Sequence, residues 1–189
     1  LYALNKYKKN LEIKGIFAED DKRNAKSEES IKFNHTYYQG ILLTIGNYRN
    51  LQTYIPQQDK NKIFYDGRKL SEISSIHELP PYSYPDLVKR SSTIDTVWLN
   101  KRHMPDSFFE IEHSTDIQNS LLKYIDLQDF NSRMIIVADS KRKPEFEAKL
   151  AFQAFEELRA KNRVSFLSYE ELTCQYEMEL KKQSLQFKL

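Results

Sequence analysis

Three acidic residues interrupt two neighbouring apolar stretches of this sequence. Asp95 lies within residues 94–99, and Glu110 and Glu112 lie within residues 108–112. An ionised carboxylate that is buried without a partner is so unfavourable that it usually pairs with a cation, takes up a proton or binds a metal. The three acids therefore predict that a cation is bound close to them.

Both stretches are typical of β-strands, because they are short, rich in β-branched and aromatic residues, and bounded by polar segments. Side chains alternate along a strand, so Glu110 and Glu112 share a face and lie roughly 7 Å apart at ~3.4 Å per residue. A hairpin through residues 100–106 sets Asp95 opposite either Glu110 or Glu112, depending on a one-residue shift of the turn. In both registers the three acids occupy one face, since directly opposed residues point the same way.

Two interpretations of this acidic face remain open at the level of sequence. A hard cation such as Mg²⁺, or Mn²⁺, takes oxygen ligands and is often held by one or two carboxylates together with water and a substrate phosphate. Alternatively, the acids pair with Arg90, Lys101 or Arg102 in a surface ion network that needs no metal.

Composition narrows the class of protein. The chain has 189 residues and a formal net charge of +2, so any binding of nucleic acid depends on local clusters of positive charge. The candidate phosphate contacts are Arg90, Lys101, Arg102, Lys123, Lys141 and Arg142. The single cysteine excludes internal disulfides and a cysteine-rich zinc site. We find no apolar run of membrane-spanning length and no signal-peptide pattern, and therefore expect a cytoplasmic protein without membrane partners.

Hydrophobic patterning divides the chain into a charged N-terminal arm, residues 1–30, and one globular domain, residues 31–189. It predicts an α/β fold with a mixed central β-sheet flanked by helices. Helices are expected at 34–47, 68–76, 115–130, from 144 to 158, and at 169–183, and strands at 52–56, 62–65, 94–99, 108–112, 134–138 and 164–167. Ser114 or Thr115 is the expected N-cap of the helix that follows the acids.

The order of these elements, a helix and then a three-stranded meander with an acid on its second strand and acids on its third, resembles the PD-(D/E)xK nuclease superfamily over roughly residues 35–172. In that pattern Asp95 matches the single aspartate, and residues 110–112 match the acid-x-Lys triplet with glutamate in place of lysine. Some type II restriction endonucleases carry this Glu-x-Glu form. The resemblance implies a restriction-endonuclease-like core.

The same resemblance implies an activity. It implies an endonuclease of a bacterial restriction or defence system that uses Mg²⁺ or Mn²⁺ to hydrolyse double-stranded DNA, as a homodimer or within a larger restriction complex. Asp95 and Glu110 would hold the metal, and Glu112 would act as general base or as a ligand for a second ion. The triplet lysine is missing, and so is the acid that the family's helix before the sheet often supplies, since residues 41–45 contain none. Lys123 is a candidate for the missing positive charge.

Two rival hypotheses follow from these departures. In the first, the chain is a catalytically inactive module of the same fold that binds nucleic acid or a protein partner. In the second, it is a protein-interaction domain that acts mainly through its charged N-terminal arm.

Overall fold

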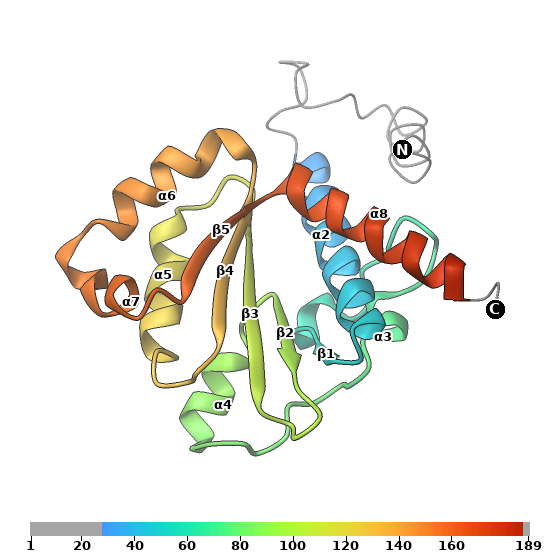
Figure 1. The fold of residues 1–189 in the computed structure, drawn as a ribbon, viewed down its shortest axis with the longest axis horizontal. Coiled ribbons are helices and arrows are strands. Elements are labelled where there is room, and N and C mark those ends of the chain that lie inside the picture. The colour runs from blue at the N-terminus through green and yellow to red at the C-terminus, as the bar shows by residue number, and fades with distance from the viewer. Residues whose placement is uncertain (1–27, 187–189) are drawn as a thin grey trace.

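A five-stranded mixed sheet forms the centre of the molecule (Figure 1). The computed structural model describes residues 28–186, and within them the side chains of residues 35–185. The strands are β1 (Gln52–Tyr54), β2 (Thr96–Leu99), β3 (Pro105–Glu112), β4 (Arg133–Ala138) and β5 (Val164–Ser168), and they are neighbours in that order. Strands β1, β2 and β3 pair antiparallel, whereas β3, β4 and β5 pair parallel. The expected α/β fold with a mixed sheet is therefore confirmed.

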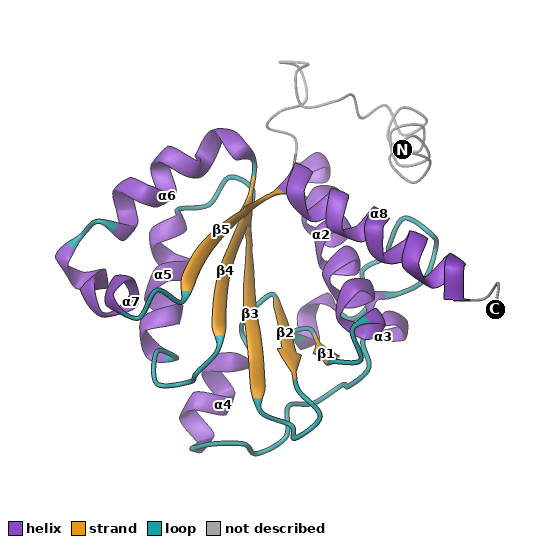
Figure 2. Ribbon diagram, in the orientation of Figure 1, coloured by secondary structure: helices purple, strands orange, loops and turns teal. Residues whose placement is uncertain are grey.

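Helices cover both faces of this sheet (Figure 2). They are α2 (Glu28–Tyr48), α3 (Leu70–Ile73), α4 (Pro85–Ser91), α5 (Ile117–Asp126), α6 (Lys143–Leu150), α7 (Glu156–Ala160) and α8 (Tyr169–Gln186). The long helices α2 and α8 pack against each other on one face, and α5 and α6 lie on the other. Each parallel strand pair is joined through helices, as a parallel connection requires.

Alternation along β3 and β4 sorts their side chains into two apolar cores. Phe109 and Ile135 pack with residues of α2 and α8, whereas Phe108 and Ile136 pack with residues of α5 and α6. This double burial explains why residues 134–138 form an uninterrupted apolar run, since a strand covered on both faces needs no polar side.

Helix α2 lies unusually close to the sheet near its carboxyl end. A β-carbon added to Gly46 would come within 2.5 Å of the Thr53 side chain and 2.7 Å of Nε1 of Trp98. Trp98 Nε1 also donates a hydrogen bond of 3.1 Å to the carbonyl of Leu42. These contacts fix the position of α2 relative to β1 and β2.

Several expected boundaries are wrong for identifiable reasons. The expected strand at 62–65 is only an isolated bridge between Ile63 and Lys69, because the chain reverses at once through Gly67, whose φ is +92°. The expected helix at 68–76 is correspondingly short, at Leu70–Ile73. The third strand begins at Pro105 instead of residue 108, because the β2–β3 hairpin closes more tightly than expected.

The helices around the acids also differ from expectation. Asp116, not Ser114 or Thr115, caps α5, and its Oδ1 accepts a hydrogen bond of 2.9 Å from the Gln118 amide. The helix expected from 144 to 158 is split into α6 and α7, because the backbone is extended at Phe152. Helix α2 begins at Glu28, earlier than expected, and residues 1–27 of the expected arm lie outside the described residues.

Candidate functional site

Strand β2 begins at Thr96, directly after Asp95, so Asp95 lies just outside the strand that was expected at 94–99. Thr96 is paired with Phe109, so one further step of the same antiparallel register sets Asp95 opposite Glu110. The ladder does not continue that far. Instead, Oδ2 of Asp95 accepts a hydrogen bond of 2.8 Å from the backbone N–H of Ile111. The carboxylate of Asp95 thus satisfies a β3 donor at the point where its strand partner is lost.

Glu110 and Glu112 lie on the face of β3 that α5 covers, and they are 2% and 5% exposed. The hydroxyl of Ser120 lies within hydrogen-bond distance of both of them, 2.9 Å from Oε2 of Glu110 and close to Oε1 of Glu112. Thr115 donates to the other oxygen of Glu112. The two glutamates therefore share one face, as their spacing predicts, and one hydroxyl links them.

Lys123 is the cation that pairs with Glu110. Its Nζ lies 2.7 Å from Oε2 and 2.9 Å from Oε1 of Glu110, and it reaches them from the last turn of α5. In the metal-free alternative, the sequence analysis expected the acids to pair instead with Arg90, Lys101 or Arg102. Arg90 pairs with Asp126 at 2.7 Å, so its recorded ionic partner is not one of the three acids.

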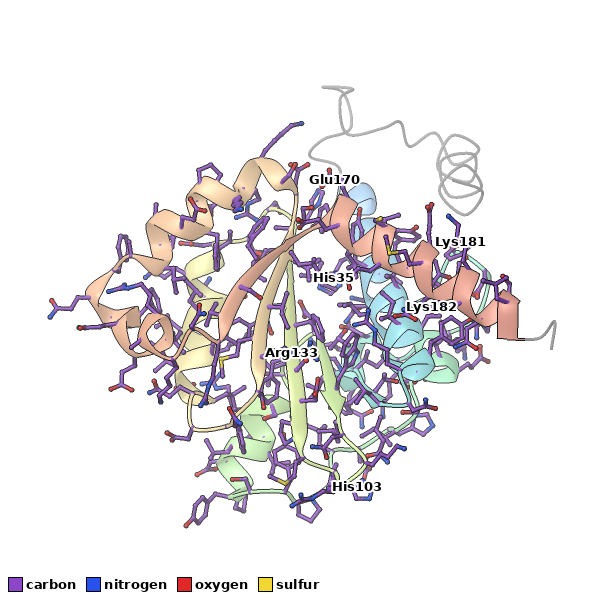
Figure 3. The ribbon with its side chains drawn as sticks, in the orientation of Figure 1. His35, His103, Arg133, Glu170, Lys181 and Lys182 are labelled. Atoms are coloured by element: carbon purple, nitrogen blue, oxygen red, sulfur yellow. The ribbon has the colours of Figure 1, made fainter. Side chains whose placement is uncertain are left out.

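Helix α2 contributes two residues that sequence reasoning missed. His35 Nε2 lies 3.1 Å from Oδ2 of Asp95, and Gln39 Nε2 donates a hydrogen bond of 2.9 Å to the backbone carbonyl of Asp95. In Figure 3, His35 lies beside α2 on the side facing the sheet. The sequence pattern that could have indicated them is the i, i+4 spacing of His35 and Gln39, which places both polar side chains on one face of the helix.

The pKa values of Asp95 and Glu110 are driven apart. Burial raises the pKa of Asp95, but His35, the Ile111 amide and Lys123 outweigh it, and the pKa falls below its usual value. Burial and the charge of Asp95 raise the pKa of Glu110 to about 8, although Lys123 and Ser120 act to lower it. Two neighbouring carboxyl groups whose pKa values divide in this way keep one charge and one proton between them at neutral pH.

Tyr124 shows how closely the three acids converge. Its hydroxyl is buried and donates a hydrogen bond of 2.7 Å to the carbonyl of Ile135. Burial raises its pKa well above the usual value, and Glu110, Asp95 and Glu112 each raise it further. All three carboxylates therefore act on a single hydroxyl from α5.

A divalent cation such as Mg²⁺ would need oxygen ligands from the side chains around the acids. Within residues 28–186 no group of three or more His, Cys, Asp or Glu side chains is arranged to hold a metal. Mg²⁺, however, is often bound by one or two carboxylates, with water and substrate phosphate completing its shell. Asp95 and Glu110 offer that smaller set, and a divalent cation bound by both would displace the proton that Glu110 keeps and move Lys123 away from it.

Arg142 and Lys141 follow the carboxyl end of β4, where Ala138 is paired with Glu112. Nη2 of Arg142 donates a hydrogen bond of 2.6 Å to the carbonyl of Thr115. Its Nη1 is buried and has no hydrogen-bond partner among the described residues. Arg142 therefore brings an unused donor close to the acids.

The other predicted phosphate contacts lie farther away. Lys101 and Arg102 are exposed in the turn between β2 and β3, next to His103, which Figure 3 places at the opposite end of the sheet from His35. β3 runs from Pro105 to Glu112, roughly 23 Å at ~3.3 Å per residue. The structure thus brings Lys123, Lys141 and Arg142 to the end of β3 that carries the acids, and keeps Lys101 and Arg102 away from it.

Comparison with known proteins gives a family and one curated relative. A family described as the C-terminal domain of the type II restriction enzyme NmeDI matches residues 16–188. The type II restriction enzyme NmeDI of Neisseria meningitidis serogroup C is 27% identical in an alignment of 118 residues. The alignment covers 57% of this chain and 33% of that enzyme. The chain thus aligns with about a third of the length of that relative. No solved structure matches it.

Proposed function

Because the chain belongs to the family of C-terminal domains of NmeDI-type type II restriction enzymes, we propose that it is the nuclease part of such an enzyme. It hydrolyses phosphodiester bonds of double-stranded DNA and uses Mg²⁺ or Mn²⁺. The observation that carries this proposal is the half-buried carboxylate of Asp95 near the buried Glu110, with Lys123 bound to Glu110, beside the start of β2. Such a cluster of buried, mutually perturbed acids is costly for the fold and is characteristic of functional sites.

Each acid has a proposed role. Asp95 and Glu110 would hold the metal, which when bound polarises the scissile phosphate and offsets the charge that develops on the leaving oxygen. Glu112 is the candidate proton acceptor, and the hydroxyls of Ser120 and Thr115 orient its carboxylate. Lys123 supplies from α5 the positive charge that the Glu-x-Glu triplet lacks.

DNA would be bound by local positive charge near the acids. Lys123, Lys141 and Arg142 are the proposed phosphate contacts closest to the site, and Arg142 would have to exchange its bonds to Glu145 for a phosphate. Arg90, Lys101 and Arg102 would contact only DNA that extends along the molecule. Such contacts give affinity that does not depend on sequence and that weakens with salt.

The proposal also concerns the assembly and its location. Cutting both strands of a duplex requires two sites or two binding events, so we propose that the chain acts as a homodimer or within a longer restriction polypeptide. The alignment with about a third of NmeDI is consistent with the second arrangement. Its place of action would be the bacterial cytoplasm, where the target DNA is found.

Cleavage of supercoiled plasmid DNA tests the proposal directly. The chain is expected to nick or linearise plasmid with Mg²⁺ or Mn²⁺, and Asp95→Asn and Glu110→Gln are expected to abolish cleavage while keeping side-chain shape. Ser184→Ala is the matched control, because the Ser184 hydroxyl bonds only within α8, to the carbonyl of Lys181. Full cleavage by either acid variant would exclude the site.

One observation favours a second candidate, an inactive module of the same fold that binds DNA or a protein. Each of the three acids already has a partner within the protein: His35 for Asp95, Lys123 for Glu110, and hydroxyls for Glu112. Calorimetric titration with Mn²⁺ separates the two candidates. Binding that Asp95→Asn removes supports the nuclease, and absence of binding to the unaltered chain supports the inactive module.

A further inference from the structure

Helix α2 holds Asp95 at two points, although it offers no acid to the site from residues 41–45. His35 contacts the carboxylate of Asp95, and Gln39, four residues later on the same helix, contacts its backbone carbonyl. Residues at i and i+4 lie one above the other on a helix, so the two side chains act from one face of α2. A single helix face thus controls both the position and the orientation of this residue.

The contacts to the carboxylate are unequal. Oδ2 of Asp95 receives both the Ile111 amide, at 2.8 Å, and His35 Nε2, at 3.1 Å. Oδ1 accepts no hydrogen bond from the residues that the structure describes. Two donors on one oxygen fix the plane of the carboxylate and leave its other oxygen available to a ligand.

Gln39 is itself held in one orientation. Its Nε2 donates to Oδ2 of Asp59 at 2.6 Å as well as to the carbonyl of Asp95. Asp59 is 3% exposed, and Lys62 Nζ lies 2.6 Å from its Oδ1. An amide rotated by 180° would turn its oxygen toward two acceptors, so only this orientation satisfies both. The buried carboxylate of Asp59, paired with the half-exposed Lys62, therefore serves to align Gln39.

We propose that His35 and Gln39 are positioning residues that hold Asp95 with Oδ1 directed at the metal, and that Asp59 aligns Gln39 for this task. This inference rests on the proposed function, since it assigns a purpose to the orientation of a proposed metal ligand. Outer groups that orient metal ligands typically change metal affinity or activity by about 10- to 100-fold when they are removed. The same range is expected for this pair.

The test measures Mn²⁺ binding by titration calorimetry on the full chain, together with thermal unfolding. In His35→Gln the amide nitrogen stands where Nε2 stands, so this variant is expected to bind Mn²⁺ nearly as the unaltered chain does. In His35→Asn the shorter side chain withdraws the donor from Asp95, and the affinity is expected to fall by about 10-fold or more. Gln39→Leu keeps a similar side-chain volume but removes the amide, and its Mn²⁺ affinity is expected to fall by a similar factor.

Thr44→Val is the matched control on the same helix. Thr44 is buried, and its hydroxyl bonds only the carbonyl of Gly40 within α2, at 2.8 Å. Its replacement is expected to lower the melting temperature slightly and to leave the Mn²⁺ affinity unchanged. A general loosening of α2 would move both quantities, so this variant separates positioning from stability.

Each outcome decides something different. If the unaltered chain binds no Mn²⁺, the metal site fails and the positioning role fails with it. If it binds Mn²⁺ and both His35→Asn and Gln39→Leu bind equally well, the site stands and the positioning role is overturned. If His35→Gln loses as much affinity as His35→Asn, His35 is itself a ligand and the proposal is also overturned. Should Gln39→Leu fail to fold, the two His35 variants decide alone, since His35 is partly exposed.

Discussion

At the scale of single residues, Glu110 is the most sensitive part of the site. Burial and the neighbouring charge of Asp95 raise its pKa to about 8, from 4.5 for a free glutamate. Between these pH values the folded protein keeps a proton that the unfolded chain has already lost. Stability then decreases as pH rises, by at most about 1.4 kcal/mol per pH unit for one proton.

This linkage gives a prediction for the metal-free protein. In the presence of a chelator, the free energy of unfolding measured by urea titration is expected to decline from about pH 5 toward pH 8 through Glu110. Glu110→Gln removes the titrating group, so its stability is expected to vary less over the same range. Parallel pH profiles for the two proteins would show that Glu110 keeps an ordinary pKa.

Lys123 gives a second prediction at this scale. Lys123→Met leaves Glu110 without its ionic partner, and the cost depends on whether Glu110 is charged. Below pH 8 Glu110 can remain protonated, and the loss of stability is expected to be small. Without Lys123 the pKa of Glu110 rises further, so at pH 9 the variant keeps a proton that the unaltered protein has released, and the loss is expected to grow. Denaturant titration of both proteins at pH 6 and pH 9 measures the difference, and an equal loss at both would contradict it.

At the scale of elements, the site depends on how α2 meets the sheet. Gly46 lets the helix approach Thr53 and Trp98, and the Trp98 indole is in turn held by its hydrogen bond to Leu42. The ring cannot move aside for a new methyl group without giving up that bond. The position of His35 and Gln39 on α2 therefore depends on a contact made near the far end of the same helix.

Gly46→Ala tests this dependence. The added methyl would meet the Thr53 side chain and the Trp98 ring within 3 Å, and overpacking of this kind typically costs about 1–3 kcal/mol. Chemical denaturation should show a loss in this range. Ser184→Ala on the exposed face of α8 is the control. An unchanged midpoint for Gly46→Ala would mean that α2 can shift without cost.

At the scale of the whole molecule, the positive charges near the acids and those at the β2–β3 turn lie at opposite ends of the sheet. Lys141 and Arg142 follow β4 beside the end of β3 that carries Glu112, whereas Lys101 and Arg102 lie beyond its start. If DNA binds over the acids, only the first group contacts phosphates next to the cleaved bond. The chain belongs to a restriction enzyme family, so this difference bears on where the duplex lies.

Salt dependence of DNA binding distinguishes the two ends. The measurement uses the Glu110→Gln variant, which is expected to bind DNA without cleaving it. In this variant, Lys141→Gln is expected to reduce the slope of the logarithm of the DNA-binding constant against the logarithm of salt concentration by about 0.9, the value for one lost phosphate contact. Lys101→Gln combined with Arg102→Gln is the control at the other end and is expected to change the slope less. A larger effect of the control would place the duplex along the β2–β3 turn instead.

The sequence determined the strands that carry or adjoin the acids and the face that Glu110 and Glu112 share. Alternation in residues 108–112 and the apolar run at 134–138 are local patterns, and both are found as expected in β3 and β4. The mixed α/β architecture followed from the order of such patterns. Short or interrupted elements were less well predicted, because the turn at Gly67 and the break at Phe152 depend on backbone conformations that hydrophobic periodicity does not encode.

Only the tertiary structure decided which groups meet the acids. His35 is 60 residues before Asp95 in the chain, and Lys123 is 13 residues after Glu110. Whether they reach the carboxylates depends on how α2 and α5 are rotated and seated on the sheet. The positions of these helices are set by packing across both cores, at residues such as Leu42 of α2 and Leu121 of α5. Local patterns can predict a buried charge, but the partner that stabilises it is chosen by long-range packing.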